Sequence, residues 1–218
     1  MAAHSWSPRQ GTIRSPSVRR SSLRRSSSLP GHSVARAGLT PDRVREAAIK
    51  LVRAEGFDAL SLGALARELG VRVPSLYNHV DNLDTLRAAV SASAILSLDE
   101  ALRDAPSLET IAHAYLAFAR TEPGLYRASL RAPNPENTHH EAAALRVLER
   151  IEEALAEFSL GPDERIDAIR GLRALLHGFV ELTLAGAFEM PRSIETSLDS
   201  VLATFRRGLE APTPGSRT

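Results

Sequence analysis

The chain has 218 residues, of which 43% are apolar, with no cysteine and a formal net charge of +1. The lack of cysteine excludes disulfides, thiolate metal sites, iron–sulfur clusters and a cysteine nucleophile. No apolar run approaches the roughly 18 residues of a membrane span, and the basic start lacks the apolar run of about 7–15 residues that a secretory signal needs. We therefore expect a cytoplasmic protein with no membrane partner.

The charge is divided unevenly along the chain. Residues 1–38 hold seven arginines, ten serines and no acid, so they carry +7, whereas residues 39–87 are neutral and residues 88–218 carry −6. A segment so poor in apolar residues is predicted to be a disordered tail. Two interpretations stay open: the tail is a basic arm that attracts phosphate, or it is a passive extension from an upstream start assignment.

The rest of the chain is predicted to be all-α, because apolar residues recur at helical spacing and no stretch alternates with a period of two. Thr40-Pro41 is typical of a helix start, and Gly56 and Gly70 are expected at helix ends as left-handed residues. A proline-rich loop is expected at 131–138 and a frayed end at 211–218. Helices are expected at about 41–55, 62–69, 72–79, 84–102, 107–120, 123–130, 140–158, 162–186 and 193–209.

Two short helices joined at Gly70 predict a helix-turn-helix within residues 39–87. The exposed face of its second helix carries side chains that can meet base edges, thymine methyls and phosphates in a major groove. These candidate DNA-binding residues, with Ser61 at the start of the preceding helix, are Arg72, Val73, Pro74, Ser75, Tyr77, Asn78 and His79.

Residues 39–87 resemble the DNA-binding domain of the TetR family of bacterial transcription regulators. The resemblance rests on Gly56, Ser61, Leu65-Ala66, Gly70-Val71, Pro74, Leu76-Tyr77, His79 and Leu86. Two positions depart from the family pattern. Arg72 stands where a Ser or Thr cap is common, and Leu83 stands where a phosphate-binding lysine is usual.

The resemblance implies a double-stranded DNA operator as partner. It implies that Ser61 bonds a phosphate at a helix N-terminus and that Tyr77 and His79 hold the DNA backbone. Arg72, Val73, Ser75 and Asn78 would then read bases. The alternatives are that Tyr77 and His79 serve only packing and that Ser61 serves only as a helix cap.

Residues 88–210 are expected to form an effector-binding and dimerisation domain. The helix at 162–186 is apolar nearly all round after Leu172, and the helix at 193–209 carries one long apolar stripe, which is more apolar surface than one core needs. We therefore expect a homodimer with a four-helix interface. The expected interface residues are Leu172, Leu176, Phe179, Val180, Leu198, Val201, Leu202 and Phe205.

The same region resembles the C-terminal domain of a TetR subfamily named for a Trp-His-Gly motif, with Leu176-His177-Gly178 in its place. The family implies an apolar pocket for a small-molecule effector. Candidate lining residues are the polar or aromatic groups on apolar helices: His113, Tyr115, Phe118, Tyr126, His177 and Glu181. A lone histidine on an apolar helix is more often a core or interface residue than a ligand group.

No cofactor is expected, and no metal site, since the adjacent His139 and His140 would point apart on a helix. The function implied is a dimeric transcription repressor that an effector releases from a palindromic operator by shifting the helix at about 84–102. An activator or a ligand-independent regulator of the same fold is an alternative. A helical enzyme or small-molecule-binding protein is a more distant one, because no cluster of nucleophile, base or metal ligands occurs at readable spacing.

Overall fold

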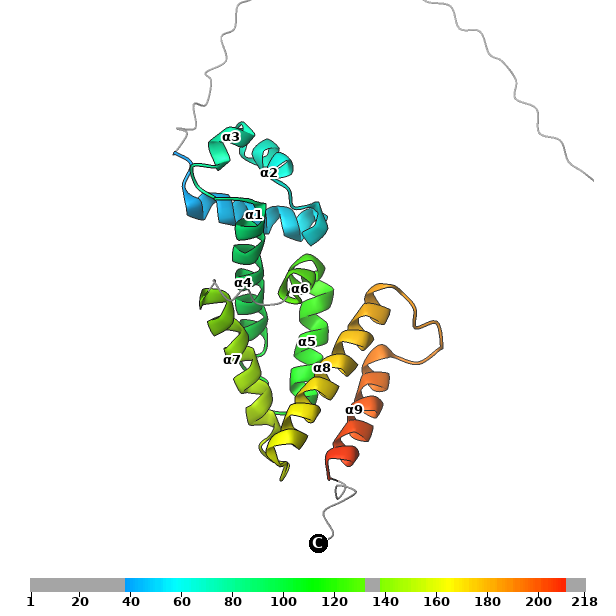
Figure 1. The fold of residues 1–218 in the computed structure, drawn as a ribbon. Helices are drawn as coiled ribbons and strands as arrows, with labels where there is room; N and C mark the ends of the chain where they lie inside the picture. Colours follow the sequence, from blue (N-terminus) through cyan, green and yellow to red (C-terminus); the bar gives the residue numbers. More distant parts are fainter. Residues whose placement is uncertain (1–37, 132–137, 211–218) are drawn as a thin grey trace, which may run out of the picture. The chain divides into compact units, whose positions relative to one another are not determined.

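The computed structural model describes residues 38–131 and 138–210, and within them it contains nine α-helices, one 3-10 helix and no strand (Figure 1). This confirms the all-α fold class. Three predicted segments lie wholly or mostly outside the described residues. They are the tail at 1–38, of which only residue 38 is described, the proline-rich loop at 131–138 and the C-terminal end at 211–218.

The first helix, α1 (Pro41–Glu55), begins and ends at the residues that the sequence predicts. The Thr40 side chain accepts a hydrogen bond from the backbone N–H of Arg43 at 3.2 Å, which satisfies one of the free amides of the first turn. Gly56 has φ 89° but ψ 164°. It is therefore extended with a positive φ, not the left-handed cap expected, because the chain leaves the helix directly into η1 (Phe57–Ala59).

The helix-turn-helix consists of α2 (Leu62–Leu69) and α3 (Val73–Leu76). Ser61 accepts from the backbone N–H of Ala64 at 3.2 Å, and Gly70 takes the left-handed conformation, with φ 65°, as predicted. The second helix is shorter than the expected 72–79. The backbone N–H groups of His79 and Val80 both bond to the carbonyl of Leu76, so the chain tightens into a turn there.

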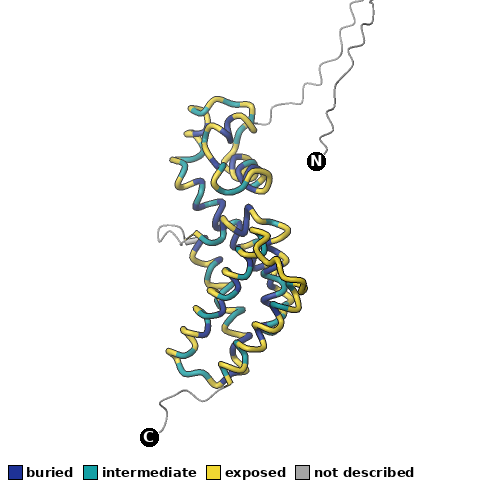
Figure 2. The backbone as a smooth tube through the Cα atoms, turned by 90° about the vertical axis from the view of Figure 1, so that its right-hand side faces the viewer, coloured by how far each residue is buried: buried dark blue, intermediate teal, exposed yellow. Residues whose placement is uncertain are grey.

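Three helices follow, α4 (Leu83–Ala101), α5 (Leu108–Thr121) and α6 (Pro123–Ser129). The long helix α4 runs without a break through residues 87–88, where the sequence suggested a domain boundary. It packs against α1 near its start and against α6 and α7 further along (Figure 1), and its buried residues therefore surround the helix instead of forming one stripe. Buried and exposed residues alternate along the described helices (Figure 2).

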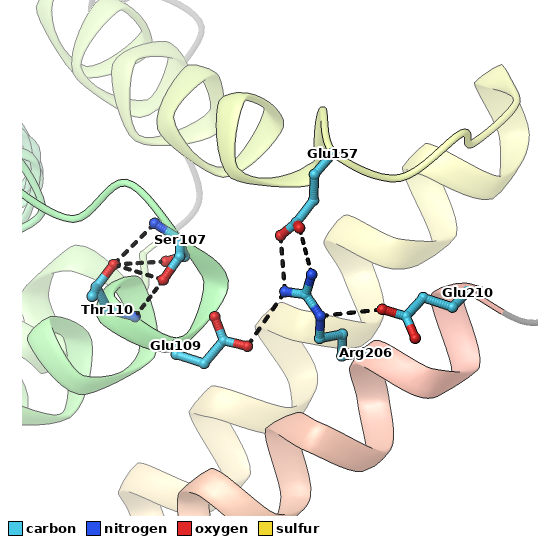
Figure 3. Close-up of polar contacts among 6 residues, drawn as sticks. All are labelled: Ser107, Glu109, Thr110, Glu157, Arg206 and Glu210. Atoms are coloured by element: carbon cyan, nitrogen blue, oxygen red, sulfur yellow. Dashed lines mark hydrogen bonds and ion pairs between the residues drawn. The ribbon is translucent and has the colours of Figure 1, made fainter.

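The chain continues with α7 (Thr138–Leu155), α8 (Pro162–Leu184) and α9 (Ile194–Glu210). Arg206 joins α9 to its neighbours (Figure 3). Its guanidinium donates to Glu157 just after α7 and forms ion pairs with Glu109 on α5 at 3.6 Å and with Glu210 at 3.2 Å. The hydrogen bonds to Glu157 are the main reason why the pKa of Arg206 lies above its ordinary value. The same guanidinium lies 5.1 Å from the centre of the Phe158 ring.

The structure corrects most of the predicted dimer interface. Five of its eight residues are buried inside the single chain and cannot contact a second one: Leu172, Leu176, Val180, Leu198 and Leu202. They look surplus in the sequence because α8 must pack on α5, α7 and α9 at once, which requires apolar residues on several sides. Val201 is exposed, and Phe179 and Phe205 are half-buried.

Candidate DNA-binding surface and ligand cavity

The short helix α3 is held in place by one fully buried side chain and exposes most of the others. Leu76 is buried against the core, while Arg72, Pro74, Ser75 and Asn78 are exposed. Tyr77 is 55% exposed. This is far more than a packing residue needs. Val73 and His79 are half-buried at the edges of the same face.

Arg72 and Ser61 differ in what they do locally. Ser61 is exposed as a residue, but its hydroxyl oxygen is engaged as the cap of α2. Arg72 precedes α3 in an extended conformation and makes no side-chain capping bond. Its guanidinium is therefore available to a partner, which is the consequence of placing an arginine where a capping Ser or Thr is common.

Three contacts tie this surface to the larger helical part. Arg87 on α4 donates to the carbonyl of Leu60 at 3.2 Å. Arg53 on α1 pairs with Glu122 at the start of α6 at 3.0 Å. Gly124 on α6 lies so close to α1 that a β-carbon there would meet the carbonyl oxygen of Val52 at 2.0 Å. Displacement of α4 or α6 must therefore affect α1 and the loop before α2.

A cavity of about 160 Å³ lies among α4, α5, α6, α7 and α8. Its wall is hydrocarbon apart from the side chains of Tyr115, Ser129 and Arg173. The aliphatic lining residues are Ile95, Leu98, Leu102, Ile111, Leu130, Ala144, Val147, Leu148, Ile151, Ile169, Leu172 and Leu176. An apolar hollow with a few polar groups is the usual form of a small-molecule site.

Tyr115 in the cavity wall contacts a second aromatic residue, Tyr126 on α6. The rings of Tyr115 and Tyr126 are perpendicular, with centroids 5.5 Å apart. The Tyr126 hydroxyl lies 2.7 Å from Nδ1 of His177. Burial raises the pKa of both tyrosines, so both keep their protons and can donate hydrogen bonds.

Of the six candidate pocket residues, the structure places only Tyr115 in the cavity wall. Phe118 and Tyr126 are core residues, and His113 bonds Asp199 on α9 at 2.6 Å. Glu181 pairs with Arg127 at 3.2 Å, and His177 faces a neighbouring hollow with Arg170 and Arg173. These five residues therefore do not line this cavity. The sequence could not distinguish its aliphatic wall from ordinary core, because both need the same residues.

Within residues 38–131 and 138–210, no group of three or more His, Asp or Glu side chains is placed so that it could hold a metal ion. No helix described there is long and apolar enough to cross a bilayer.

An exposed helix-turn-helix joined to a larger helical bundle defines a class of protein, the helix-turn-helix DNA-binding regulators. Family models agree. Residues 44–95 match the model described as bacterial regulatory proteins of the tetR family, and residues 108–205 match the tetracyclin repressor-like C-terminal domain. The helix-turn-helix transcriptional regulator YobS of Bacillus subtilis is 34% identical over 182 residues, which are 80% of this chain and 94% of that protein. The chain belongs to the TetR family of bacterial transcription regulators.

Solved structures support the same fold. A protein of unknown function from Rhodococcus sp. RHA1 superposes with a TM-score of 0.62 at 23% identity, covering 82% of this chain and 98% of that one. A variant of TetR from Acinetobacter baumannii AYE, in complex with minocycline, gives a TM-score of 0.50 at 23% identity, covering 80% and 100%.

Proposed function

We propose that this chain is a homodimeric transcription repressor that binds a palindromic operator and is released from it by a small molecule. The observation that carries the proposal is that α4 belongs to both parts of the molecule. Its first half contacts Leu60, directly before the helix-turn-helix, through Arg87, and its second half supplies Ile95 and Leu98 to the cavity wall. An occupant of the cavity therefore touches the helix that positions the DNA-binding surface.

The exposed face of α3 supports the DNA part of the proposal. Arg72, Ser75 and Asn78 present donors and acceptors to solvent, and these read base edges in a major groove. Tyr77 is exposed at the end of the same helix, where its hydroxyl would bond a phosphate. The segment 39–87 has no net charge, so its affinity must depend on such placed contacts and on dimerisation.

The groove between α8 and α9 supports the homodimer. It is lined by Leu175, Ser200, Val201, Thr204, Phe205, Gly208 and Leu209, and Val201 is 39% exposed. A second copy placed there about a two-fold axis would complete a four-helix interface. Two recognition helices could then read half-sites about 34–36 Å apart on one face of the DNA. The cytoplasm, where the DNA is, is the compartment for this function.

The operator experiment uses the full chain and DNA from upstream of its own gene, with a random duplex of equal length as control. A specific complex with two protomers, which weakens steeply as salt rises, is expected. Arg72→Ala should reduce the preference for operator over random DNA, because a lost base contact relaxes specificity by about 1–3 kcal/mol. Tyr77→Phe should weaken both complexes alike. The reverse pattern would show that the two roles are assigned wrongly, and no complex at low salt would refute the proposal.

A second experiment tests whether a small molecule releases the protein from its operator. Compounds that raise the melting temperature of the DNA-free protein are added to the operator complex. A repressor of the proposed kind loses operator affinity, because a ligand shifts the equilibrium only by its differential affinity for the two states. A ligand that binds and leaves operator affinity unchanged would exclude effector control.

A further inference from the structure

Arg173 on α8 lies at the junction of two hollows. One is the apolar cavity of about 160 Å³. The other is a hollow of about 320 Å³ lined by Arg170, Ala174 and His177. The two share Leu130 and Arg173, so the apolar cavity adjoins a hollow lined by the nitrogen-bearing side chains of Arg170, Arg173 and His177.

The charged side chains that line these two hollows, Arg170 and Arg173, are both positive. Neither hollow has an aspartate or glutamate among the described residues of its wall. Arg170 and Arg173 form no ion pair or hydrogen bond with any residue in the described ranges, whereas nearby arginines do. Arg127 pairs with Glu181 and Arg131 with Asp84. Two guanidinium groups one turn apart on α8 are thus left without an anion beside an apolar cavity.

We propose that the cavity binds a small organic carboxylate, with its apolar body among the aliphatic side chains and its carboxylate at Arg173 and Arg170. The inference rests on the proposed function, in which this cavity is the effector site. A guanidinium matches a carboxylate in geometry and charge, and the pair is stronger at the edge of an apolar space than in open water. The cavity is below the roughly 300–1,000 Å³ of drug-sized sites, so the apolar body is small.

The head group is tested with three probes that share one tail: octanoate, 1-octanol and octyltrimethylammonium. Binding to the full-length, DNA-free protein is measured by calorimetry at low and high salt. Octanoate should bind more tightly than octanol, and only its affinity should fall as salt rises, because salt screens the exposed charges. Equal affinities for octanoate and octanol, tighter binding of the cation, or no binding of octanoate at millimolar concentration would overturn the proposal.

Variants test the position. Arg173→Gln should weaken octanoate binding about three- to fivefold, as expected for a charge pair at an exposed arginine, and leave octanol binding unchanged. Arg165→Gln is the matched control, since it makes the same change on α8 outside both hollows and should have no effect. Ala144→Phe fills the cavity and should abolish binding of both compounds, with Ala144→Leu as a milder variant if the first does not fold. An octanoate affinity equal in Arg173→Gln and Arg165→Gln contradicts the assignment.

Failure of this inference differs from failure of the proposed function. If octanoate binds in an Arg173-dependent way but does not release the operator, the ligand chemistry stands and effector control fails. If another compound releases the operator while octanoate does not bind, the repressor stands and the carboxylate assignment fails.

Discussion

Gly124 on α6 packs directly on the backbone of Val52 in the last turn of α1. A β-carbon at residue 124 would lie 2.0 Å from the Val52 carbonyl oxygen, far inside van der Waals contact. That oxygen already accepts the hydrogen bond from Gly56 that ends the helix, so it cannot move aside without cost. Only glycine allows α6 of the larger helical bundle to lie this close to α1.

Gly124→Ala is therefore expected to push α6 away from α1 and to lower the free energy of unfolding by about 1–3 kcal/mol, the usual cost of overpacking. Chemical denaturation measures it. The matched control is Gly63→Ala on α2, where a β-carbon meets nothing within 4 Å and should give a gain of about 0.5–1 kcal/mol from helix propensity. Equal effects of the two substitutions would mean that the contact does not constrain the fold.

The contact between Gly124 and Val52 should also transmit the effect of a bound ligand from the cavity to the DNA-binding surface. If it does, Gly124→Ala will change how far a bound compound lowers operator affinity, while the compound's affinity for the DNA-free protein changes little. If ligand binding lowers operator affinity equally in Gly124→Ala and the parent protein, the effect is transmitted through α4 and not through this contact.

Tyr126 should make stability fall at alkaline pH. Burial, followed by the neighbouring Tyr115, raises its pKa above the ordinary value of 10.0 in the folded chain. Its contribution is complete below about pH 10 and is lost as the pH rises further, because the unfolded chain then releases a proton that the folded chain keeps. Tyr126→Phe should flatten the loss of stability above about pH 10, measured by denaturation at each pH. A slope as steep as in the parent protein would contradict this.

At neutral pH the same substitution should lower the free energy of unfolding by about 0.5–1.5 kcal/mol, because it removes the hydrogen bond between the Tyr126 hydroxyl and His177. Tyr115→Phe is the companion variant. The pKa of Tyr115 is raised by burial as well, so this change should also flatten the alkaline slope while leaving the bond to His177 intact.

Val201 and Leu198 lie on the same helix, α9, but we expect substitutions at the two positions to affect different properties. Leu198 is 1% exposed within one chain, so Leu198→Ala should lower the unfolding free energy by about 2–5 kcal/mol. Val201 is 39% exposed in the groove between α8 and α9, so Val201→Asp should shift the protein from dimer to monomer and leave the monomer helical. Sedimentation and circular dichroism separate the two effects. A Val201→Asp protein that remains dimeric would place the interface elsewhere.

Arg206 is expected to stabilise the end of the bundle in a salt-dependent way. Arg206→Gln removes its pairs with Glu157, Glu109 and Glu210 and its position over Phe158, so the melting temperature should fall. The difference from the parent should shrink at high salt, because the group is accessible to ions. Arg207→Gln, whose side chain bonds only Thr204 among the described residues, is the control. Similar effects of the two changes would argue against the network.

Local chemistry explains why most helix boundaries could be read from the sequence. Thr40, Ser61 and Ser107 all cap helices as such residues do, and Gly70 turns the chain with a positive φ. These effects act within a few residues, so neighbours in the chain are enough to determine them. The short α3 is the exception, since its end depends on how Leu76 is anchored in the core.

What the sequence by itself determined is the helical class, the helix-turn-helix and the family, because these depend on spacing along one chain. Only the tertiary structure decided what each apolar residue faces. Leu172, Leu176 and Leu198 belong to the inside of one chain, and Leu172 and Leu176 also form part of the cavity wall. An aliphatic side chain has the same chemistry in a core, a cavity wall or a dimer interface. Which of the three it occupies is therefore settled by how helices distant in sequence pack together.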